Sequence, residues 1–237
     1  MKKIAIGIGE NNNIVKAIEI FKNKYKIDIL PIGNDDDLVN AILDSDIDAV
    51  IRGSLPASGV IRQLKSHYPD ISRATYVNGD GHEFLLTPVG IDEGNTLDEK
   101  LKIAINCGEF LKKLSKEPKI AVLADGRKGD YGRSEIISKS IDDSEKLTSM
   151  IKENTDFEVK NYYILIEKAL NDNCNVIIAP DGIIGNIIFR TLILVNSWPS
   201  CGAVTFGIDK VYIDTSRDQS VEGYLRSIKF AYNLANL

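Results

Sequence analysis

An α/β fold with mostly parallel strands is predicted by the alternation of two kinds of segment along the chain. Short apolar runs, such as Lys3 to Gly9, alternate with longer segments in which apolar residues recur at helical spacing, such as Ile14 to Tyr25. A strand, a helix and a second strand in succession form a right-handed crossover between parallel strands, so the alternation predicts a parallel sheet covered by helices. A chain of 237 residues is long enough for one large α/β unit or two smaller lobes.

Composition and charge narrow the functional classes. The net charge of −5 argues against a nucleic acid as a bulk electrostatic partner. No apolar run reaches membrane-spanning length, and Met1-Lys2-Lys3-Ile4 runs into a strand without a signal peptide, so we expect a soluble cytoplasmic protein. The 3 cysteines are widely spaced and predict free thiols, and 2 histidines are too few for a histidine-rich metal centre. We therefore expect no metal and no bound cofactor.

The first part of the chain is typical of a β-α-β-α-β unit. Gly7 and Gly9 end the first strand without the third glycine of a dinucleotide-binding motif, so a plain strand-to-helix turn is favoured over a phosphate cradle. Asn11 or Asn12 is expected to cap the helix that follows. The predicted elements are strands 3–9, 27–32 and 47–51 and helices 14–25 and 35–43.

The third strand ends at a loop of small residues, Arg52 to Ser58. Two interpretations of Gly53 and Ser54 are open. They form either a turn that faces a ligand or an ordinary loop in which the serine caps a helix.

A β-hairpin is predicted next. Ser72 to Val77 and Glu83 to Val89 have strand-like sequence, and the Asn-Gly-Asp-Gly segment between them favours a tight turn. The pattern changes around Ile91 to Thr96, where we place the boundary between two lobes. A capping sequence at Thr96 then begins a long amphipathic helix that reaches about Ser115.

The loop from Ala124 to Ser134 follows strand 119–123 and is rich in glycine and basic residues. Glycines let backbone N–H groups approach an anion, and basic side chains match phosphate. We therefore expect Gly126, Lys128 and Gly129 to bind a phosphate or carboxylate group. The alternative is a mobile surface turn, in which nearby aspartates partly neutralise the basic side chains.

The remaining elements lead to a second polar loop. Pro180-Asp181-Gly182 ends a strand at 176–179, and Gly185-Asn186 begins a helical segment. Asp214 to Ser220 lies directly before the terminal helix, where parallel α/β proteins commonly display ligand-binding residues. The other predicted elements are helices 135–140, 143–154 and 162–170 and strands 157–159, 203–208 and 211–213.

Two motifs in this region resemble the C-terminal signature of the phosphate acetyl/butyryl transferase family. They are Pro180-Asp181-x-x-x-Gly185-Asn186-Ile187 and Ser216-Arg217-x-x-Ser220-Val221-Glu222, and their spacing is also similar. The whole chain looks most like the shorter methanogen relatives of that family, the methyltransferase-related MtxX proteins. The resemblance implies a two-lobed α/β/α parallel-sheet fold of the phosphate acetyltransferase and isocitrate dehydrogenase type. Lobe I would hold residues 1–92 plus 207–237, and lobe II residues 93–206.

The resemblance also implies a substrate site between the lobes. Ser216 would hydrogen-bond the developing oxyanion or the thiol, and Arg217 would hold phosphate and stabilise charge in the transition state. Arg73 lies in a hairpin strand similar to the S-R-T-S-G strand of the family and would be an anion ligand. The other residues expected to contact substrate are Gly53, Ser54, Gly126, Lys128, Gly129, Asp181 and Asn186.

The chain departs from the family pattern at two positions. Gly223 stands where the family carries the aspartate that is its usual candidate for general base, and Glu222 is about 100° away around the helix. Asp218 replaces a small glycine and brings a carboxylate close to the expected anion. The motifs thus predict an inherited cleft and an altered reaction.

Three functions remain open. The first is acyl transfer between an acyl phosphate and a thiol such as coenzyme A, which would be a substrate and not a bound cofactor. The second is a methyltransferase-related role in methanogen one-carbon metabolism, with methyltransferase subunits as partners. The third is ligand binding without catalysis. A homodimer is expected in each case.

Overall fold

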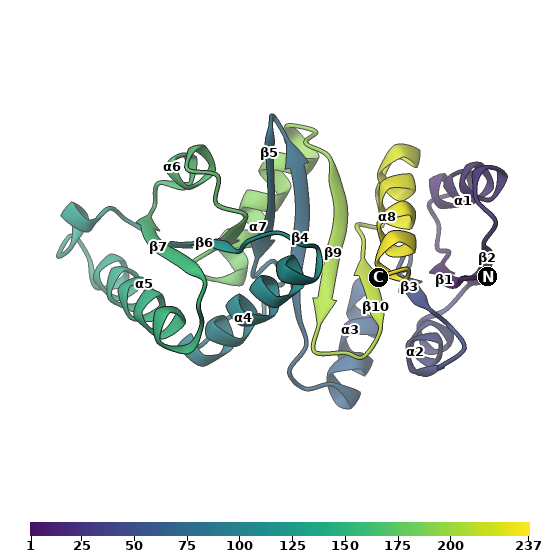
Figure 1. Cartoon of the computed structure of the whole chain (residues 1–237), viewed down its shortest axis with the longest axis horizontal. Coiled ribbons are helices and arrows are strands. Elements are labelled where there is room, and N and C mark those ends of the chain that lie inside the picture. Colours follow the sequence, from purple (N-terminus) through teal and green to yellow (C-terminus); the bar gives the residue numbers. More distant parts are fainter. The chain divides into compact units, whose positions relative to one another are not determined.

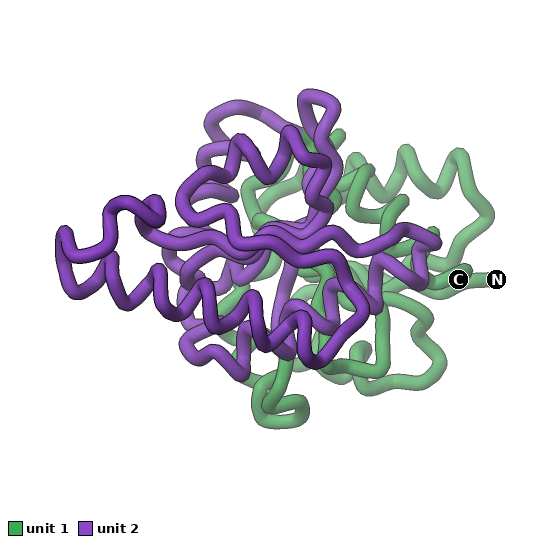
Figure 2. Tube along the Cα trace, turned by 60° about the vertical axis from the view of Figure 1, so that its left-hand side comes forward, with its two compact units in different colours: residues 1–71, 199–237 green, residues 72–198 purple.

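The computed structural model describes all residues from 1 to 237, and they form two compact units. Unit 1 contains residues 1–71 and 199–237, and unit 2 contains residues 72–198 (Figure 2). Unit 1 is discontinuous, and the hairpin residues from 72 onward lie in unit 2, whereas the predicted lobe I held residues 1–92 plus 207–237. The reason is hydrogen bonding, since the second hairpin strand pairs through Leu85, Leu86 and Thr87 with a strand of unit 2.

Unit 1 is built on a sheet with strand order β2-β1-β3-β10-β9. The first four of these strands are parallel, and β9 is antiparallel to β10. Strand β10 is the C-terminal strand, yet it pairs with β3 through Ile213 and Ile51. The strands are β1 (Lys3–Gly7), β2 (Asp28–Ile32), β3 (Ala49–Ile51), β9 (Ser200–Phe206) and β10 (Val211–Asp214).

Helices cover both faces of the unit 1 sheet (Figure 1). On one face, α2 and α3 pack together over a core that includes Leu38, Leu64 and the fully buried Tyr212. On the other face, α1 and α8 pack side by side, and Phe21 meets Tyr232 edge to face at 5.9 Å. The helices are α1 (Asn13–Lys24), α2 (Asp35–Leu43), α3 (Ala57–His67) and α8 (Val221–Leu234).

Unit 2 has strand order β4-β5-β8-β6-β7. Strands β4 and β5 form the predicted antiparallel hairpin, which turns at Asp80 and Gly81, both with positive φ (52° and 79°). This two-residue turn is the type expected from an Asp-Gly sequence. The remaining strands are parallel. The strands are β4 (Ser72–Gly79), β5 (His82–Thr87), β6 (Lys119–Leu123), β7 (Glu158–Tyr163) and β8 (Val176–Ile178).

The helices of unit 2 divide between the two faces of its sheet. The long helices α4 and α5 pack on each other, whereas residues of α6 and α7 belong to a separate apolar core with Phe84, Leu123 and Ile177. None of the helices in the chain combines the length and the apolarity that a membrane span requires. The helices are α4 (Leu97–Lys113), α5 (Glu135–Asn154), α6 (Ile166–Asn171), α7 (Gly182–Phe189), the 3₁₀ turn η1 (Lys128–Asp130) and the π-helical segment η2 (Arg190–Val195).

Two predicted helices differ in the structure. The segments 135–140 and 143–154 form the single helix α5, because Ile141 is buried and the apolar stripe continues through it. The predicted helix 162–170 was wrong in its first part, since Tyr162 and Tyr163 end strand β7 and the helix begins only at Ile166. Tyr162 is a residue of strand β7 and is buried against α6, so its apolar side chain was wrongly counted in the helical pattern.

Candidate functional site

The loop between β10 and α8, residues 215–220, is called the Ser216 loop and is fixed through its backbone. The hydroxyl of Tyr224, a fully buried residue of α8, donates hydrogen bonds to the carbonyl oxygens of Ser216 (3.2 Å) and Arg217 (2.8 Å). The side-chain amide of Asn11 donates to the carbonyl oxygens of Arg217 (3.0 Å) and Gln219 (3.1 Å). These contacts use main-chain acceptors, so they hold the loop without occupying the side chains of Ser216 and Arg217.

The two predicted catalytic side chains remain accessible. Ser216 is half-buried, and its hydroxyl oxygen accepts only a long hydrogen bond from the backbone N–H of Asp218, at 3.4 Å. The Arg217 side chain is 64% exposed, and its Nε lies 3.8 Å from a carboxylate oxygen of Asp218. The Asp218 side chain, at 82% exposure, is too solvated to neutralise Arg217 strongly. A hydroxyl donor and a guanidinium group are thus presented at the N-terminal end of helix α8.

Asn11 or Asn12 was expected to cap helix α1, and the side-chain oxygen of Asn11 does accept a hydrogen bond from the backbone N–H of Asn13, the first residue of that helix, at 3.0 Å. Asn12 occupies the cap position without a side-chain hydrogen bond. The amide nitrogen of Asn11 also reaches residues more than 200 positions away in sequence, at the Ser216 loop. The local hydrogen bond of Asn11 could be predicted from the sequence, whereas the remote partners of its amide nitrogen are shown only by the fold.

The Gly53 turn packs against the end of the first strand. Gly53 has a φ of +64°, and a Cβ atom there would lie 1.9 Å from the carbonyl oxygen of Gly7. The backbone N–H of Gly9 donates to the Ser54 hydroxyl at 2.8 Å. Gly7 and Gly9 therefore serve close backbone packing, which agrees with the predicted strand-to-helix turn. The Ser54 hydroxyl accepts from a loop N–H and does not cap α3, whose cap residue is Pro56.

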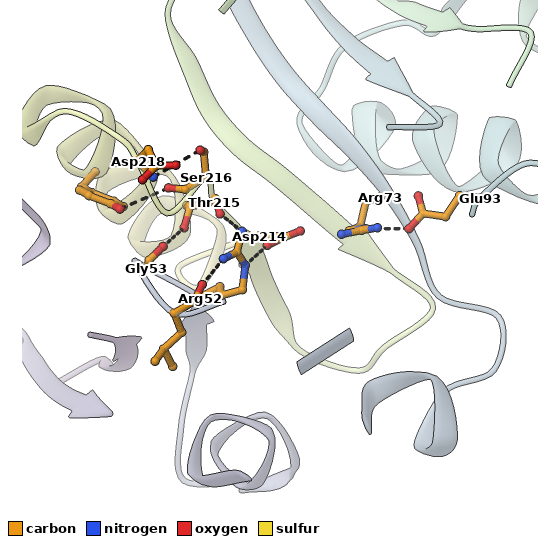
Figure 3. A network of polar contacts seen from close by, with 10 residues as sticks. Arg52, Gly53, Arg73, Glu93, Asp214, Thr215, Ser216 and Asp218 are labelled. Atoms are coloured by element: carbon orange, nitrogen blue, oxygen red, sulfur yellow. Dashed lines mark hydrogen bonds and ion pairs between the residues drawn. The ribbon is translucent and has the colours of Figure 1, made fainter. Parts of the chain in front are cut away.

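A buried arginine joins this turn to the Ser216 loop (Figure 3). Arg52 is 5% exposed and forms an ion pair with Asp214, which is 9% exposed. The same guanidinium donates to the carbonyl oxygens of Leu55 and Thr215. The Thr215 hydroxyl completes the connection by donating to the carbonyl oxygen of Gly53 at 2.7 Å. Gly53, Ser54, Ser216 and Arg217 thus belong to one connected region of unit 1.

Sequence reasoning missed the roles of Arg52 and Asp214, although a signal was present. Each is a charged residue directly after an apolar strand segment, Ala49–Ile51 and Val211–Ile213 respectively. Charges are rarely buried unless they are paired. Two such residues of opposite sign at strand ends could have been proposed as partners.

Arg73 of unit 2 also forms a buried ion pair. Its Nε lies 2.7 Å from Oε1 of Glu93, and the two side chains are 11% and 4% exposed. The other carboxylate oxygen of Glu93 is buried without a hydrogen-bond partner. The partnership with Glu93 was not predicted, because nothing in the sequence distinguishes Glu93 from other loop carboxylates. The role of Arg73 as an anion ligand stays a prediction.

Asp181 and Asn186 both hold local structure around helix α7. Asp181 is the N-cap, and its Oδ1 accepts a hydrogen bond from the Ile184 N–H at 2.8 Å. The Asn186 side-chain amide donates to the carbonyl oxygen of Val89 at 2.9 Å. The second oxygen of Asp181 has no hydrogen bond to the protein, so this residue keeps the capacity to contact a ligand.

The basic loop 124–134 is organised by its own carboxylate. One oxygen of Asp130 accepts from the Arg127 N–H at 2.8 Å, and the other pairs with the Arg133 side chain at 2.8 Å. Gly126 is buried, and a Cβ there would lie 2.8 Å from Ile137, whereas Gly129 faces open space. Lys128 is 77% exposed and lies 3.5 Å from Glu145. Part of the expected anion-binding surface is therefore already paired within the loop.

The predicted site residues are divided between the units. Ser216, Arg217, Gly53 and Ser54 lie in unit 1. The proposed single pocket that includes unit 2 residues stays a prediction, and those residues are Arg73, Gly126, Lys128, Gly129, Asp181 and Asn186. No group of three or more His, Cys, Asp or Glu side chains is arranged to hold a metal ion.

Comparison with known proteins identifies the family. The chain is 40% identical, over 238 residues, to an uncharacterized methyltransferase of Methanocaldococcus jannaschii, and the match covers 95% of each chain. It is 41% identical over 183 residues to the mtx subunit X of Methanosarcina mazei, whose name assigns it to the methyltransferases. That match covers 76% of this chain and 65% of the relative. The chain belongs to the MtxX family.

The fold of this MtxX-family protein is that of the phosphotransacylases. It superposes on the crystal structure of a branched-chain phosphotransacylase from Enterococcus faecalis with a TM-score of 0.75, at 17% identity and with 99% of each chain covered. Both parts of the predicted resemblance are thereby confirmed, and so is the fold class. No family model matches the sequence.

Proposed function

We propose that this MtxX-family protein transfers an acyl group between an acyl phosphate and a thiol of the coenzyme A type, at the Ser216 loop. The observation that supports this most directly is that the loop is held through its backbone, which leaves two of its side chains available. Its carbonyl groups are held by Tyr224 and Asn11, while the Ser216 hydroxyl accepts only a long hydrogen bond and the Arg217 side chain is largely exposed. The phosphotransacylase fold gives a second line of support.

The chemistry follows from these two groups. Arg217 would bind the phosphate of the acyl phosphate through paired N–H donors, with help from the N-terminal end of α8. The thiolate would attack the acyl carbonyl carbon, and the Ser216 hydroxyl would donate to the oxygen that becomes negative. Inorganic phosphate then leaves as the thioester forms. A well-placed donor of this kind typically contributes about 3–4 kcal/mol to transition-state stabilisation.

The thiol must lose its proton for this reaction, because the thiolate is the nucleophile. Gly223 supplies no carboxylate, so deprotonation would depend on solvent or on Asp218. We therefore propose a slow transferase. Its acyl group, its thiol and its expected homodimeric state remain parts of this proposal.

The proposal is tested by measuring thioester formation from acetyl phosphate or butyryl phosphate and coenzyme A. We expect Arg217→Gln to lower kcat/KM by about 10²–10³, the usual effect of removing one such donor. The matched control is Arg62→Gln, which removes an exposed arginine of helix α3 in the same unit. Equal activity in the Arg217 variant and the wild type would reject the proposed role of the loop.

A second candidate function comes from the names of the relatives. A relative named as a subunit of a methyltransferase suggests that this chain acts within a methyltransferase assembly. In that case it would co-purify with methyltransferase subunits at fixed stoichiometry. Thermal stabilisation by coenzyme A or acyl phosphate without turnover would instead favour a ligand-binding protein that has lost catalysis.

A further inference from the structure

A polar cavity lies wholly within unit 2, and no residue of the Ser216 loop lines it. Its volume is about 260 Å³, and it opens where strands β6 and β8 end. Polar side chains at its wall include Lys100, Asp125, Asp143 and Asp181, and apolar side chains include Val122 and Leu147. Small-molecule sites have this composition, in which a few convergent polar groups are set in an apolar surface.

The position of the cavity in the sheet is typical of a ligand site. Neighbouring strands β6 and β8 are parallel, so their carboxyl ends lie at one edge. The chain leaves β6 toward α5 and leaves β8 toward α7, and these helices pack in different cores on the two faces of the sheet. In open α/β sheets, ligands bind at the point where consecutive connections diverge in this way.

Lys100 brings an incompletely paired cation to this cavity. It lies in the second turn of α4, is half-buried, and donates a hydrogen bond to the carbonyl oxygen of Pro180. Its remaining N–H donors have no acceptor in the protein. Burial lowers the pKa of Lys100 below its ordinary value, although the carboxylates of Asp143 and Asp181 act in the opposite direction. An anionic group in the cavity would therefore stabilise the charged lysine.

Two carboxylates at the cavity are also available. Asp125 uses its backbone N–H to donate to the Ser140 hydroxyl at 3.0 Å, and its carboxylate accepts no hydrogen bond from the protein. Asp181 uses only one carboxylate oxygen, as the cap of α7. Asp143, by contrast, is paired with Lys139. Lys139 also lines the cavity, and its charge is compensated by Asp143, so the groups outside this ion pair are one cation and two anions.

We propose that this cavity binds a small α-amino acid with an apolar side chain. Lys100 holds its carboxylate, Asp125 and Asp181 hold its ammonium group, and Val122, Ile136 and Leu147 contact the side chain. A ligand with only an anionic group would pair with Lys100 but would be repelled by the two carboxylates. A simple amine would leave the lysine uncompensated. A zwitterion provides a partner both for Lys100 and for the two carboxylates. The volume of the cavity limits the ligand to a small metabolite.

Isothermal titration of the full chain with L-leucine tests this site. Two analogues each lack one charged group: 4-methylpentanoate has no amine, and 3-methylbutylamine has no carboxylate. We expect saturable binding of leucine, and at least about tenfold weaker binding of each analogue, because each analogue leaves a charged group of the site without its hydrogen-bond partner. Equal binding of either analogue, or no binding of leucine, would overturn the proposal.

Variants locate the binding within the molecule. Lys100→Met and Asp125→Asn should each weaken leucine binding at least about tenfold, by the same loss of a charged hydrogen bond. Lys113→Met is the matched control, because Lys113 is an exposed residue at the end of the same helix. Unchanged leucine affinity in Lys100→Met would overturn the assignment.

A measurement on the wild-type chain covers the case in which Lys100→Met fails to fold. Leucine should slow acetylation of Lys100 by an activated acetate ester, as followed by peptide mass spectrometry, and should leave Lys113 unaffected. Equal labelling of Lys100 with and without leucine would reject the site. Because the cavity shares no residue with the Ser216 loop, failure of this test leaves the proposed acyl transfer intact, and the reverse also holds.

Discussion

The hydroxyl of Tyr224 lies 2.8 Å from the carbonyl oxygen of Arg217 and fixes a loop that is otherwise polar and partly exposed. Tyr224→Phe removes this hydrogen bond and the one to Ser216. We expect a loss of about 1–2 kcal/mol in the free energy of unfolding, since a typical hydrogen bond contributes roughly 0.5–1.5 kcal/mol. Urea unfolding measures the loss. Tyr232→Phe on the same helix is the control, because its hydroxyl forms no hydrogen bond to the protein.

The same tyrosine predicts a pH dependence of stability. Burial raises the pKa of Tyr224 to about 12, from 10.0 in its unperturbed state. Between these values the unfolded chain loses the phenol proton while the folded chain keeps it, so stability falls as the pH rises from 10 to 12. Urea unfolding at several pH values should show a shallower decline in Tyr224→Phe than in the wild type. An identical decline would contradict the assignment. Tyr76, whose pKa burial also raises to about 12, accounts for part of the remaining slope.

Gly53→Ala should be destabilising for two reasons. The position has a φ of +64°, and the added Cβ would lie 1.9 Å from the carbonyl oxygen of Gly7. Backbone strain alone costs about 1–3 kcal/mol, and the collision adds to it. Gly33→Ala is the control within the same unit, because a Cβ there meets nothing within 4 Å. Similar thermal unfolding temperatures for the two variants would contradict the described packing.

Breaking the buried pair between Arg52 and Asp214 should have a large effect. Arg52→Met leaves a buried carboxylate without its partner, a change that typically costs about 3–5 kcal/mol. Lys2→Met breaks the more exposed pair of Lys2 with Asp48 and should cost less than about 1 kcal/mol. Denaturant unfolding compares the two. Because Arg52 also donates to the Thr215 carbonyl, Arg52→Met should lower acyl transfer even at temperatures where the variant is folded.

Gly223 offers a test of the missing general base. A Cβ at this position would lie 2.3 Å from the end of the Gln219 side chain, so an aspartate needs that side chain to move. We therefore expect Gly223→Asp combined with Gln219→Ala to raise the rate of acetyl transfer to coenzyme A by about 10²–10⁴, the usual contribution of general-base catalysis.

The control for this gain is Gly223→Asn combined with Gln219→Ala, which has a similar shape and no base. Equal rates in the two double variants would show that a carboxylate at position 223 does not act as a base. A wild-type rate that collapses in Asp218→Asn would assign the base to Asp218.

The sequence predicted the order and the type of most elements, because apolar periodicity and turn residues are local signals. The turn at Asp80-Gly81 and the helical segment that begins at Asp181 were both predicted from such local signals. The start of α6 was misplaced because Tyr162 is apolar at a position that suits either a strand or a helix. The Ser216 loop was located by its motif, but its supports were not. Asn11 and Arg52 act across more than 160 residues of sequence, and such contacts follow from the topology alone.

The placement of β10 has a consequence for the order in which the molecule is completed. This strand lies between β3 and β9, so the N-terminal segment of unit 1 leaves the edge of β3 unpaired until the last part of the chain has been synthesised. All of unit 2 is made during that interval. Strand β3 is fully buried in the finished protein at Ala49, Val50 and Ile51. An apolar strand edge of this kind promotes aggregation as long as it is unpaired. A nascent chain arrested before residue 211 should therefore bind a chaperone, and release of the last residues should end that dependence.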